Sequence, residues 1–457
     1  MIKMINPATE EVIRTWEPLS ESEIEAALAK AHYAFNDWRQ TSVSERLKAV
    51  QKLGQLLGEQ KDSLANLISQ EMGKIQSEAR AEVKKCQSLC EHYLQHAEAA
   101  LQPIPVSTES HKSYVSFSPL GVVLGIMPWN FPFWQALRFA VPTIIAGNTV
   151  VLKHASNVMG CAEALAQLFE AAGFPAGVMQ NLPIQSGQVK GLIADSRVRA
   201  LSLTGSTEVG RKVGALAGQH LKKSVLELGG SDPAILLDDA PLEQAAQACI
   251  KSRLMNAGQS CIAAKRLIVT TKNHQAFLEA LKEGLKAHKF GDPRDSKSTY
   301  GPLARKDLRE DLHQQVLDSL ANGARALLGA QIPEGPGFFY GATLLDQVRP
   351  GQRAFDEELF GPVLAVVPAT SEAEAVKLAN QSPFGLGASI YSEDLERAES
   401  LAARELHAGN CFVNDFVRSD PRLPFGGIGD SGWGRELSDW GLREFCNVKT
   451  LVVKSLC

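Results

Sequence analysis

Three side chains in three separate segments could together carry out nucleophilic catalysis. Cys261 lies in the segment NAGQSCIAAKR (256–266), just before an apolar run that predicts a strand. Glu227, in ELGG (227–230), could act as a base, and Asn130, in PWNFP (128–132), could donate a hydrogen bond to an oxyanion. A lone cysteine is most often a small buried residue and asparagine favours turns, but the three together favour catalysis.

These segments, in this order, resemble those of the aldehyde dehydrogenase superfamily. The resemblance extends from INP (5–7) to GG (426–427), and several motifs in a fixed order are far more specific than one short pattern. It implies oxidation of an aldehyde to a carboxylic acid, with Cys261 as the nucleophile, Glu227 as the base and Asn130 as the oxyanion donor.

The chemistry sets requirements for each of these groups. Thiolate is the reactive form of cysteine, and an unperturbed thiol is only a few per cent ionised at neutral pH. Attack of Cys261 on an aldehyde would form an oxyanion, for which the Asn130 amide and the Cys261 backbone N–H are the expected donors. Loss of one such donor costs about 10² to 10³ in rate. Hydride transfer would leave a thioester, and Glu227 would deprotonate the water that hydrolyses it.

The expected cofactor site has no GxGxxG pattern. The segment TGSTEVG (204–210) follows a predicted strand and opens a helix, so Gly205 and Ser206 lie where backbone N–H groups and the helix dipole could meet a phosphate. The resemblance implies that this turn binds the pyrophosphate. It adds four cofactor contacts: Lys153 at the adenosine ribose, Glu358 at the nicotinamide ribose, Phe360 beside it, and Trp129. Without the resemblance, Lys153 would be read as solvated and Phe360 as a core aromatic.

One position bears on the choice between NAD and NADP. In the resembling family, NAD-preferring members often have a carboxylate three residues after Lys153, which binds the 2′-hydroxyl and repels a 2′-phosphate. This chain has Ser156 there. We therefore expect NADP to be preferred, with NAD as a weaker substitute.

Arg138 indicates the substrate. It lies eight residues after Asn130, on a helix predicted to begin near Pro132, and one turn beyond Trp134. In the resembling family this helix lines the substrate tunnel, and succinate-semialdehyde dehydrogenases resemble this chain in having arginine there. A guanidinium can bind a carboxylate through two parallel hydrogen bonds, and Ser419 matches a position from which such relatives add a hydroxyl. The alternative is that Arg138 is a surface residue lying over an amphipathic helix.

The expected substrate is therefore a short aldehyde with a distal carboxylate, succinate semialdehyde first and glutarate semialdehyde next. A general aliphatic aldehyde remains open. Transfer of the acyl group to coenzyme A is a second alternative, although a thiol acceptor does not need Glu227. A non-catalytic nucleotide-binding protein is a third, because fold does not determine function.

The order of predicted elements indicates the fold class. Residues 1–101 read as mostly helical, with Ser-x-x-Glu capping boxes at Ser20 and Ser42. Apolar β-branched runs then alternate with helical stretches, which predicts parallel sheets. The predicted strands are 121–127, 149–152, 200–203, 234–237 and 267–270, and the predicted helices are 161–172, 242–256 and 275–288.

The predicted fold is α/β, with two Rossmann-like parallel-sheet domains and a small β domain for bridging and oligomerisation. We assign the cofactor-binding domain to 1–101 and 120–229, the catalytic domain to 230–429, and the bridging domain to 102–119 and 440–457. The last strand, 450–454, has no local partner, and such an edge invites pairing with another chain. The resemblance implies a homodimer or homotetramer.

Composition excludes several classes of protein. The chain has 457 residues, too many for one ordinary core, and its net charge of −4 gives no support to nucleic-acid binding. The absence of a signal peptide or a long apolar run predicts no membrane segment and a cytoplasmic location. The cysteines have no paired metal-site spacing, so no metal is expected; they are Cys86, Cys90, Cys161, Cys249, Cys261, Cys411, Cys446 and Cys457.

Overall fold

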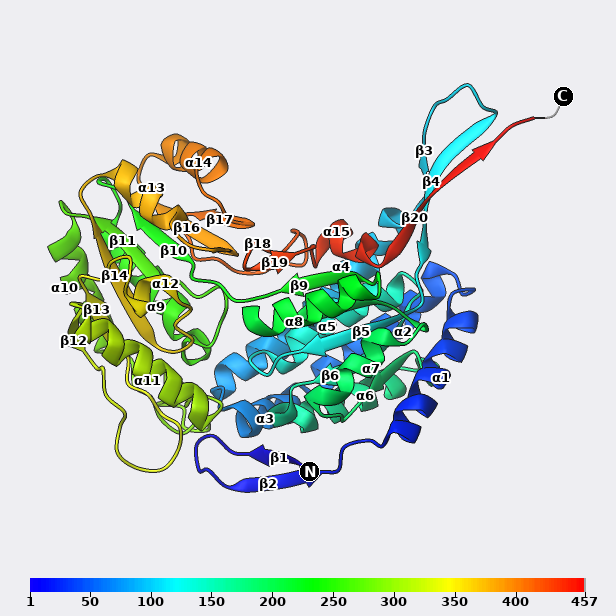
Figure 1. Cartoon of the computed structure of the whole chain (residues 1–457), viewed down its shortest axis with the longest axis horizontal. Helices are drawn as coiled ribbons and strands as arrows, with labels where there is room; N and C mark the ends of the chain where they lie inside the picture. Colours follow the sequence, from blue (N-terminus) through cyan, green and yellow to red (C-terminus); the bar gives the residue numbers. More distant parts are fainter. Residues whose placement is uncertain (456–457) are drawn as a thin grey trace.

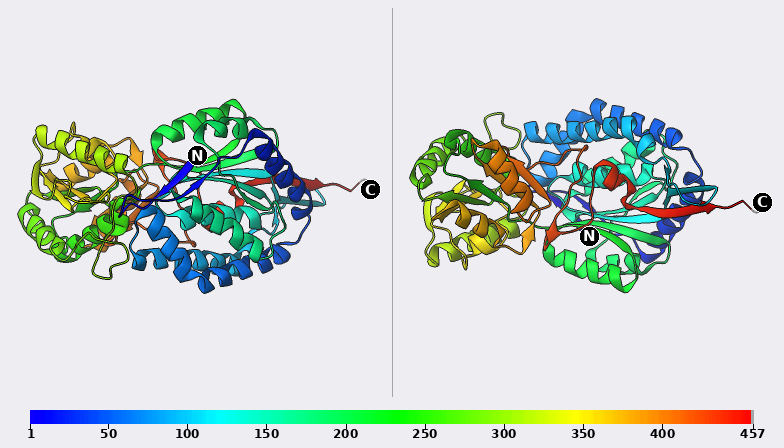
Figure 2. Two further views of the ribbon diagram at one scale, coloured as in Figure 1. Left: turned by 90° about the horizontal axis from the view of Figure 1, so that it is seen from below. Right: turned by 90° about the horizontal axis from the view of Figure 1, so that it is seen from above.

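The computed structural model describes residues 1–455. The last two residues of the predicted segment 440–457, including Cys457, lie outside the described residues. Figure 1 shows two lobes, each built on a sheet covered by helices, and a narrow ribbon of strands that projects from one lobe. The two further views show the same division between the lobes (Figure 2). The predicted α/β class, with two parallel-sheet units and a small third sheet, is confirmed.

The first lobe contains a six-stranded sheet of order β19-β9-β8-β5-β6-β7, in which only β19 is antiparallel to its neighbour. All residues of β5 are buried, as expected for a central parallel strand that is covered on both faces. The strands are β5 (Val122–Met127), β6 (Thr149–His154), β7 (Met179–Asn181), β8 (Val198–Thr204), β9 (Lys223–Glu227) and β19 (Gly432–Trp433).

Helices complete this lobe, and the two predicted capping boxes are confirmed. Ser20 and Ser42 each accept a hydrogen bond from the backbone of the glutamate three residues later, which bonds back to the serine N–H. These caps start α1 (Glu21–Trp38) and α2 (Val43–Glu59). The other helices are α3 (Lys61–Met72), α4 (Gln76–Ala100), α5 (Pro132–Ile145), α6 (Met159–Ala171), α7 (Val189–Ala194) and α8 (Thr207–Gln219), with short 3-10 turns at Ser156–Val158 and Ser186–Gln188.

The second lobe contains a seven-stranded sheet of order β12-β13-β14-β11-β10-β16-β17, in which only β12 is antiparallel to its neighbour. Its strands are β10 (Pro233–Leu236), β11 (Arg266–Thr270), β12 (Arg325–Leu328), β13 (Thr343–Asp346), β14 (Val363–Ala369), β16 (Gly387–Tyr391) and β17 (Asn410–Val413). Its helices are α9 (Leu242–Leu254), α10 (His274–Leu285), α11 (Lys306–Ala321), α12 (Arg353–Asp356), α13 (Glu372–Asn380) and α14 (Leu395–Arg404).

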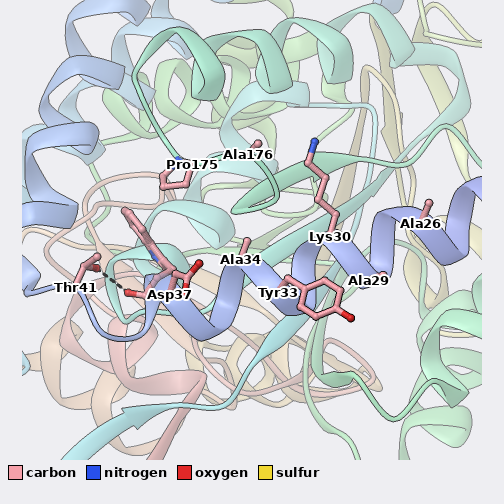
Figure 3. Close-up of a pocket in the computed structure, with 10 residues that line it drawn as sticks. Ala26, Ala29, Lys30, Tyr33, Ala34, Asp37, Thr41, Pro175 and Ala176 are labelled. Carbon is pink, nitrogen blue, oxygen red and sulfur yellow. Dashed lines mark hydrogen bonds between the residues drawn. The ribbon is translucent and has the colours of Figure 1, made fainter.

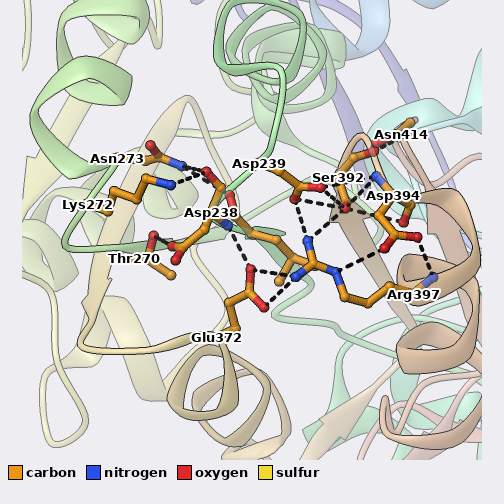
Figure 4. Close-up of polar contacts among 11 residues, drawn as sticks. Asp238, Asp239, Thr270, Lys272, Asn273, Glu372, Ser392, Asp394, Arg397 and Asn414 are labelled. Atoms are coloured by element: carbon orange, nitrogen blue, oxygen red, sulfur yellow. Dashed lines mark hydrogen bonds and ion pairs between the residues drawn. The ribbon is translucent and has the colours of Figure 1, made fainter.

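An ion-pair network joins the elements at the carboxyl edge of this second sheet (Figure 4). Arg397, on α14, pairs with Asp239 after β10 at 2.6 Å and with Glu372 on α13 at 3.0 Å. Ser392, which follows β16, also bonds to Asp239 at 2.9 Å. The network therefore holds two covering helices to the ends of two strands.

The third unit is the projecting sheet, whose order is β20-β4-β3. Its strands are β3 (Ile104–Pro105), β4 (Lys112–Pro119) and β20 (Cys446–Val453). The last strand has no partner nearby in the sequence, but it has a distant one: β20 pairs antiparallel with β4 along its whole length. The other edge of β20 has no partner strand within residues 1–455, and Val448 and Val452 are 61% and 59% exposed.

One boundary differs from the predicted division of the chain. Residues 440–457 were assigned to the third unit, but α15 (Ser438–Glu444) packs against α4 and α5 of the first lobe. Short pairs complete the fold: β1 (Ile2–Ile5) with β2 (Val12–Trp16), and β15 (Phe384–Gly385) with β18 (Ile428–Gly429). Over residues 1–455, no helix combines the length and the apolar character needed to cross a membrane.

Candidate active site

The segment that carries Cys261 lies at the junction of the two lobes. Cys261 and Ile262 pack against the core of the first lobe, whereas Ala257 and Ala264 belong to the core of the second. The lobes therefore meet at the expected nucleophile, in agreement with the general placement of ligand sites between domains.

The turn before Cys261 has an unusual backbone conformation. Asn256 and Ala257 have φ values of 55° and 54°, in the left-handed region that non-glycine residues rarely adopt. A Cβ on Gly258, at φ +75°, would lie 2.2 Å from the carbonyl oxygen of Gly361, so only glycine fits. The Asn256 N–H donates to Glu78 on α4 at 2.9 Å. Strain of this kind persists where surrounding contacts impose it, typically at functional sites.

Asn130 is held beside this turn. Its backbone carbonyl accepts hydrogen bonds from Lys74 Nζ at 3.0 Å and from Asn256 Nδ2 at 2.8 Å. Its own Nδ2 donates to the Gln259 carbonyl at 3.1 Å. A primary amide has two hydrogens, so one donor remains for an oxyanion near Cys261.

Cys261 is partly exposed, but its surroundings do not favour ionisation. Burial raises the pKa of the Cys261 thiol to about 12, against the opposing effect of the positive charges of Lys265 and Arg138. Lys265 is fully buried and its Nζ donates to the Cys261 carbonyl at 2.7 Å. Lys265 therefore fixes the nucleophile's backbone, and the thiol stays protonated at neutral pH in the protein alone.

Glu227 is the last residue of β9 and is 2% exposed. Neither carboxylate oxygen has a hydrogen-bond partner within residues 1–455. Burial, and then the negative charge of Glu436, raise the pKa of Glu227 well above its usual range, and Arg138 acts in the opposite direction. A carboxylate with so little stabilisation is a strong proton acceptor once it is ionised.

A cavity of about 430 Å³ opens beside Cys261, a volume suited to a small-molecule ligand. It is formed by α4, α5, the nucleophile segment and the loop after β17. Its lining includes the predicted residues Trp134, Arg138, Cys261 and Ser419, together with Glu78, Glu82, Lys85, Phe131, Gln135, Lys251, Met255, Phe416, Arg418 and Phe425. Asn130 and Glu227 are not among the described lining residues.

Helix α5 presents Arg138 and Trp134 to this cavity. All residues of the helix are buried, so the alternative of a surface arginine over an amphipathic helix is wrong. Its first turn is capped by Glu82, whose carboxylate accepts from the backbone N–H groups of Phe133 at 2.9 Å and Trp134 at 3.1 Å. The guanidinium of Arg138 is partly engaged: its Nε bonds to Glu436 in a buried ion pair, whereas its buried Nη2 has no hydrogen-bond partner within residues 1–455.

Ser419 is 7% exposed and contacts a residue that the sequence did not indicate. Lys85, on α4, donates from Nζ to Ser419 Oγ at 2.7 Å and lies 4.3 Å from the centroid of the Trp134 ring. Burial, and then the charge of Arg138, lower the pKa of Lys85 to about 8. Two of the predicted substrate residues, Ser419 and Trp134, thus contact a cation other than Arg138, namely Lys85.

At the expected pyrophosphate turn, the two predicted residues differ in availability. The Gly205 N–H donates to the Glu227 carbonyl at 3.0 Å, so it is already engaged. Ser206 is the N-cap of α8, and its hydroxyl accepts from the Val209 N–H at 3.4 Å. The other N–H groups of the first helical turn have no partner inside the helix and form the positive end that suits a phosphate.

Lys153 and Ser156 lie at and just beyond the carboxyl end of β6. Lys153 is half-buried, its ammonium has no hydrogen-bond or ion-pair partner within residues 1–455, and burial lowers its pKa. Ser156 is exposed and begins a 3-10 turn. Neither side chain is a carboxylate that would repel a 2′-phosphate.

Glu358 contacts the backbone after β9, and Phe360 contacts Trp129. The Glu358 carboxylate accepts from the Gly230 N–H at 3.1 Å and lies 3.6 Å from Lys265 Nζ. A Cβ on the neighbouring Gly229 would come within 2.6 Å of that carboxylate. Phe360 is half-buried and meets Trp129 edge to face, with ring centroids 5.8 Å apart.

The sequence interpretation missed Lys85, Lys265 and Glu436. The only signal for Lys85 is its spacing: Glu78, Glu82 and Lys85 follow one another at helical intervals on α4. Such a row of charges is usually a solvated face, yet Glu82 is buried here in an ion pair with Lys74.

A second, larger concavity of about 650 Å³ lies far from this chemistry, between α1 and the residues 175–176 (Figure 3). Its polar lining consists of Lys30, Tyr33, Asp37 and Thr41, with Trp38 and several alanines. None of these lining residues is a cysteine, so this concavity does not offer the predicted nucleophile.

Comparisons with known proteins identify the family of the chain. The sequence profile of the Aldehyde dehydrogenase family matches residues 1–451. The chain is 46% identical over 447 residues to Succinate semialdehyde dehydrogenase [NAD(P)+] Sad of Escherichia coli K12, covering 98% of this chain and 96% of the other. It is 43% identical to a probable NADP⁺-dependent succinate-semialdehyde dehydrogenase of Synechocystis, covering 98% and 99%. A Streptococcus pyogenes succinic semialdehyde dehydrogenase solved with NADP⁺ superposes with a TM-score of 0.97, 36% identity and full coverage of both chains.

Proposed function

Because the chain belongs to the aldehyde dehydrogenase family, we propose that it oxidises succinate semialdehyde to succinate, with NADP as the preferred cofactor and NAD as a weaker one. The enzyme is an NAD(P)-dependent aldehyde dehydrogenase. The observation that carries the substrate proposal is a single cavity in which Cys261 is accompanied by Arg138, Ser419 and the cation of Lys85.

In this mechanism Cys261 gives its proton to a base and its sulfur bonds to the aldehyde carbon. The carbonyl oxygen becomes an oxyanion that accepts hydrogen bonds from Asn130 Nδ2 and the Cys261 backbone N–H. The nicotinamide cofactor supplies the acceptor for the hydride that leaves this carbon. Water then attacks the resulting thioester while Glu227 accepts its proton, and the C–S bond breaks to release the acid and the Cys261 thiolate. Return of the proton from Glu227 regenerates the thiol.

The residues at the junction fit a dinucleotide. The first turn of α8 after Ser206 offers unpaired N–H groups to the pyrophosphate, and the unpartnered ammonium of Lys153 suits the adenosine ribose. Glu358 would bind the nicotinamide ribose, between Gly230 and the edge-to-face pair of Phe360 and Trp129. Ser156, a neutral hydroxyl, supports the preference for NADP because it does not repel a 2′-phosphate.

The distal carboxylate of the substrate would bind among Arg138, Ser419 and Trp134. A carboxylate prefers charged or hydroxyl donors. Such donors line the same cavity as the nucleophile. Glutarate semialdehyde, one methylene longer, is the expected second substrate. Transfer to coenzyme A is disfavoured because a thiol, which is far more acidic than water, does not need a base such as Glu227.

Two broader features belong to this proposal. We expect a homodimer or homotetramer formed through the projecting sheet, because β20 has an open edge and exposed valines. We expect a cytoplasmic location, in keeping with seven free cysteines among the described residues.

The decisive experiment is a panel of aldehydes followed by the absorbance of reduced nicotinamide. Succinate semialdehyde, glutarate semialdehyde and butanal would each be tested with NADP and NAD, with and without coenzyme A. The proposal expects the highest kcat/KM for succinate semialdehyde with NADP, and no dependence on coenzyme A. Equal kcat/KM for butanal and succinate semialdehyde would contradict the substrate, and product formation only with coenzyme A would contradict the reaction.

A further inference from the structure

Lys85 is a cation in the cavity that forms no ion pair with a carboxylate of residues 1–455, although the more distant Asp420 and Glu82 favour its charged form. Its Nζ makes one hydrogen bond, to the neutral hydroxyl of Ser419, and stacks over the Trp134 ring. No carboxylate of residues 1–455 lies within 4.0 Å of it. An ammonium has three donor hydrogens, so two remain unused.

The other cations near the cavity are placed differently. Lys74 pairs with Glu82, and Arg138 pairs with Glu436; both pairs are buried. Arg418 is exposed and pairs with Asp415. Lys251 is also exposed and lies over the Phe416 ring. Lys85 is therefore the cation that combines partial burial with the lack of a carboxylate.

Burial of a charge is unfavourable unless the charge is paired. The lowered pKa of Lys85 is the expected response to burial without a partner. An anionic ligand that entered the cavity would remove this penalty and would gain a charge-assisted hydrogen bond. Lys85 is thus placed to bind the carboxylate of a ligand that enters the cavity.

We infer that Lys85, assisted by Ser419, binds the distal carboxylate of the substrate beside Arg138, whose Nε pairs with Glu436 while its Nη2 has no hydrogen-bond partner within residues 1–455. Lys85 is thus a specificity-determining residue. This inference rests on the proposed function, since it names the group that recognises the same substrate.

The position of Lys85 along α4 suits this role. Glu78, one of the residues that fix the nucleophile turn, lies seven residues earlier on the same helix, which corresponds to about 10 Å along the axis. The carboxylate would therefore bind away from the reacting carbon, at the end of the cavity opposite the turn. The aldehyde group would then point towards Cys261.

The test compares Lys85→Met with the wild type on succinate semialdehyde and on butanal, which has the same carbon chain and no charge. Methionine keeps an unbranched stem against Trp134. We expect kcat/KM for succinate semialdehyde to fall by about ten- to 150-fold, the effect of one charge-assisted hydrogen bond, and kcat/KM for butanal to stay within about twofold. Lys84→Met, at the neighbouring exposed lysine of α4 that does not line the cavity, is the matched control and should show a small effect on both aldehydes.

Each outcome decides the inference. An equal loss for both aldehydes, or no loss for succinate semialdehyde, would overturn it, the latter leaving Arg138 as the reader of the carboxylate. If Lys85→Met does not fold, Lys85→Arg and Lys85→Gln replace it: arginine should retain the preference for succinate semialdehyde, and glutamine should lose it. A wild-type enzyme that does not prefer succinate semialdehyde over butanal would refute the proposed function itself, independently of any variant.

Discussion

Arg138 and Glu436 form a buried ion pair between residues 298 positions apart in the chain. The pair joins the middle of α5 to the segment just before α15, and Arg138 also lies over the Phe425 ring. Its charge acts on the pKa values of both Cys261 and Glu227. One guanidinium thus takes part in holding the lobe together and in the electrostatics of the site.

Replacement of Glu436 by glutamine should destabilise the protein. Removing one partner of a buried ion pair leaves an uncompensated charge and costs about 3–5 kcal/mol in the free energy of unfolding. Chemical denaturation followed by circular dichroism measures this change. Asp292→Asn is the control, because its pair with Arg294 is exposed and such pairs contribute only about 0–1 kcal/mol. Equal effects of the two substitutions would show that the buried Arg138–Glu436 pair contributes no more to the free energy of unfolding than an exposed pair.

Cys261→Ala should abolish aldehyde oxidation and leave cofactor binding nearly intact. The change removes the nucleophile and little volume, and Lys265 still holds the backbone of the segment through the Cys261 carbonyl. Turnover by nicotinamide absorbance and NADP binding by calorimetry measure the two effects. Substantial turnover in the purified variant would refute the covalent mechanism.

Glu227→Gln should allow hydride transfer but block hydrolysis of the thioester. Rapid mixing with saturating substrate is expected to give a burst of reduced cofactor of about one equivalent per active site, followed by a slow phase, as for any accumulating acyl-enzyme. A uniformly slow rate without a burst, in a variant that binds NADP normally, would mean that Glu227 acts before or during hydride transfer.

The preference for a charged aldehyde should weaken above about pH 8. Lys85, with a pKa of about 8, carries its charge below that pH and loses it above. Carboxylate binding therefore weakens as pH rises. The ratio of kcat/KM for succinate semialdehyde to that for butanal should fall about tenfold between pH 7 and pH 9. Ionisation of Cys261 affects both aldehydes and cancels in this ratio.

Two titratable groups near Lys85, Asp420 and Cys86, have pKa values shifted away from this range. Arg422 and burial act in opposite directions on Asp420, and the stronger effect of Arg422 lowers the pKa of Asp420 to about 2. Burial raises the pKa of Cys86 well above its usual range. Two further charged groups lie near Lys85: Glu82, which is paired with Lys74, and Arg138, which is paired with Glu436. A ratio that is constant from pH 7 to pH 9 would show that Lys85 does not bind the carboxylate.

The sequence alone determined the local elements of this protein and the residue types of its chemistry. The capping boxes at Ser20 and Ser42 start their helices as predicted, because a cap depends on residues three positions apart. The alternation of β-branched runs with helices predicted the parallel sheets, because the pattern of each strand or helix is contained in a short stretch of sequence. Cys261, Glu227 and Asn130 could be singled out in the same way, because each lies in a motif of a few adjacent residues and the motifs follow one another in a fixed order.

Only the tertiary structure decided which distant residues surround these groups. The resemblance placed the segments of β4 and β20 in one domain, but their antiparallel pairing and its register leave no mark in either segment. Lys85 donates a hydrogen bond to Ser419, which lies 334 positions later in the chain. A lysine on a helix is interpreted as solvated unless the residues that pack over it are known. Arg138 is predicted to face a carboxylate from the substrate, and the structure adds an internal partner, Glu436. The packing of α5 against distant segments brings that anion to it, and no local pattern marks the contact.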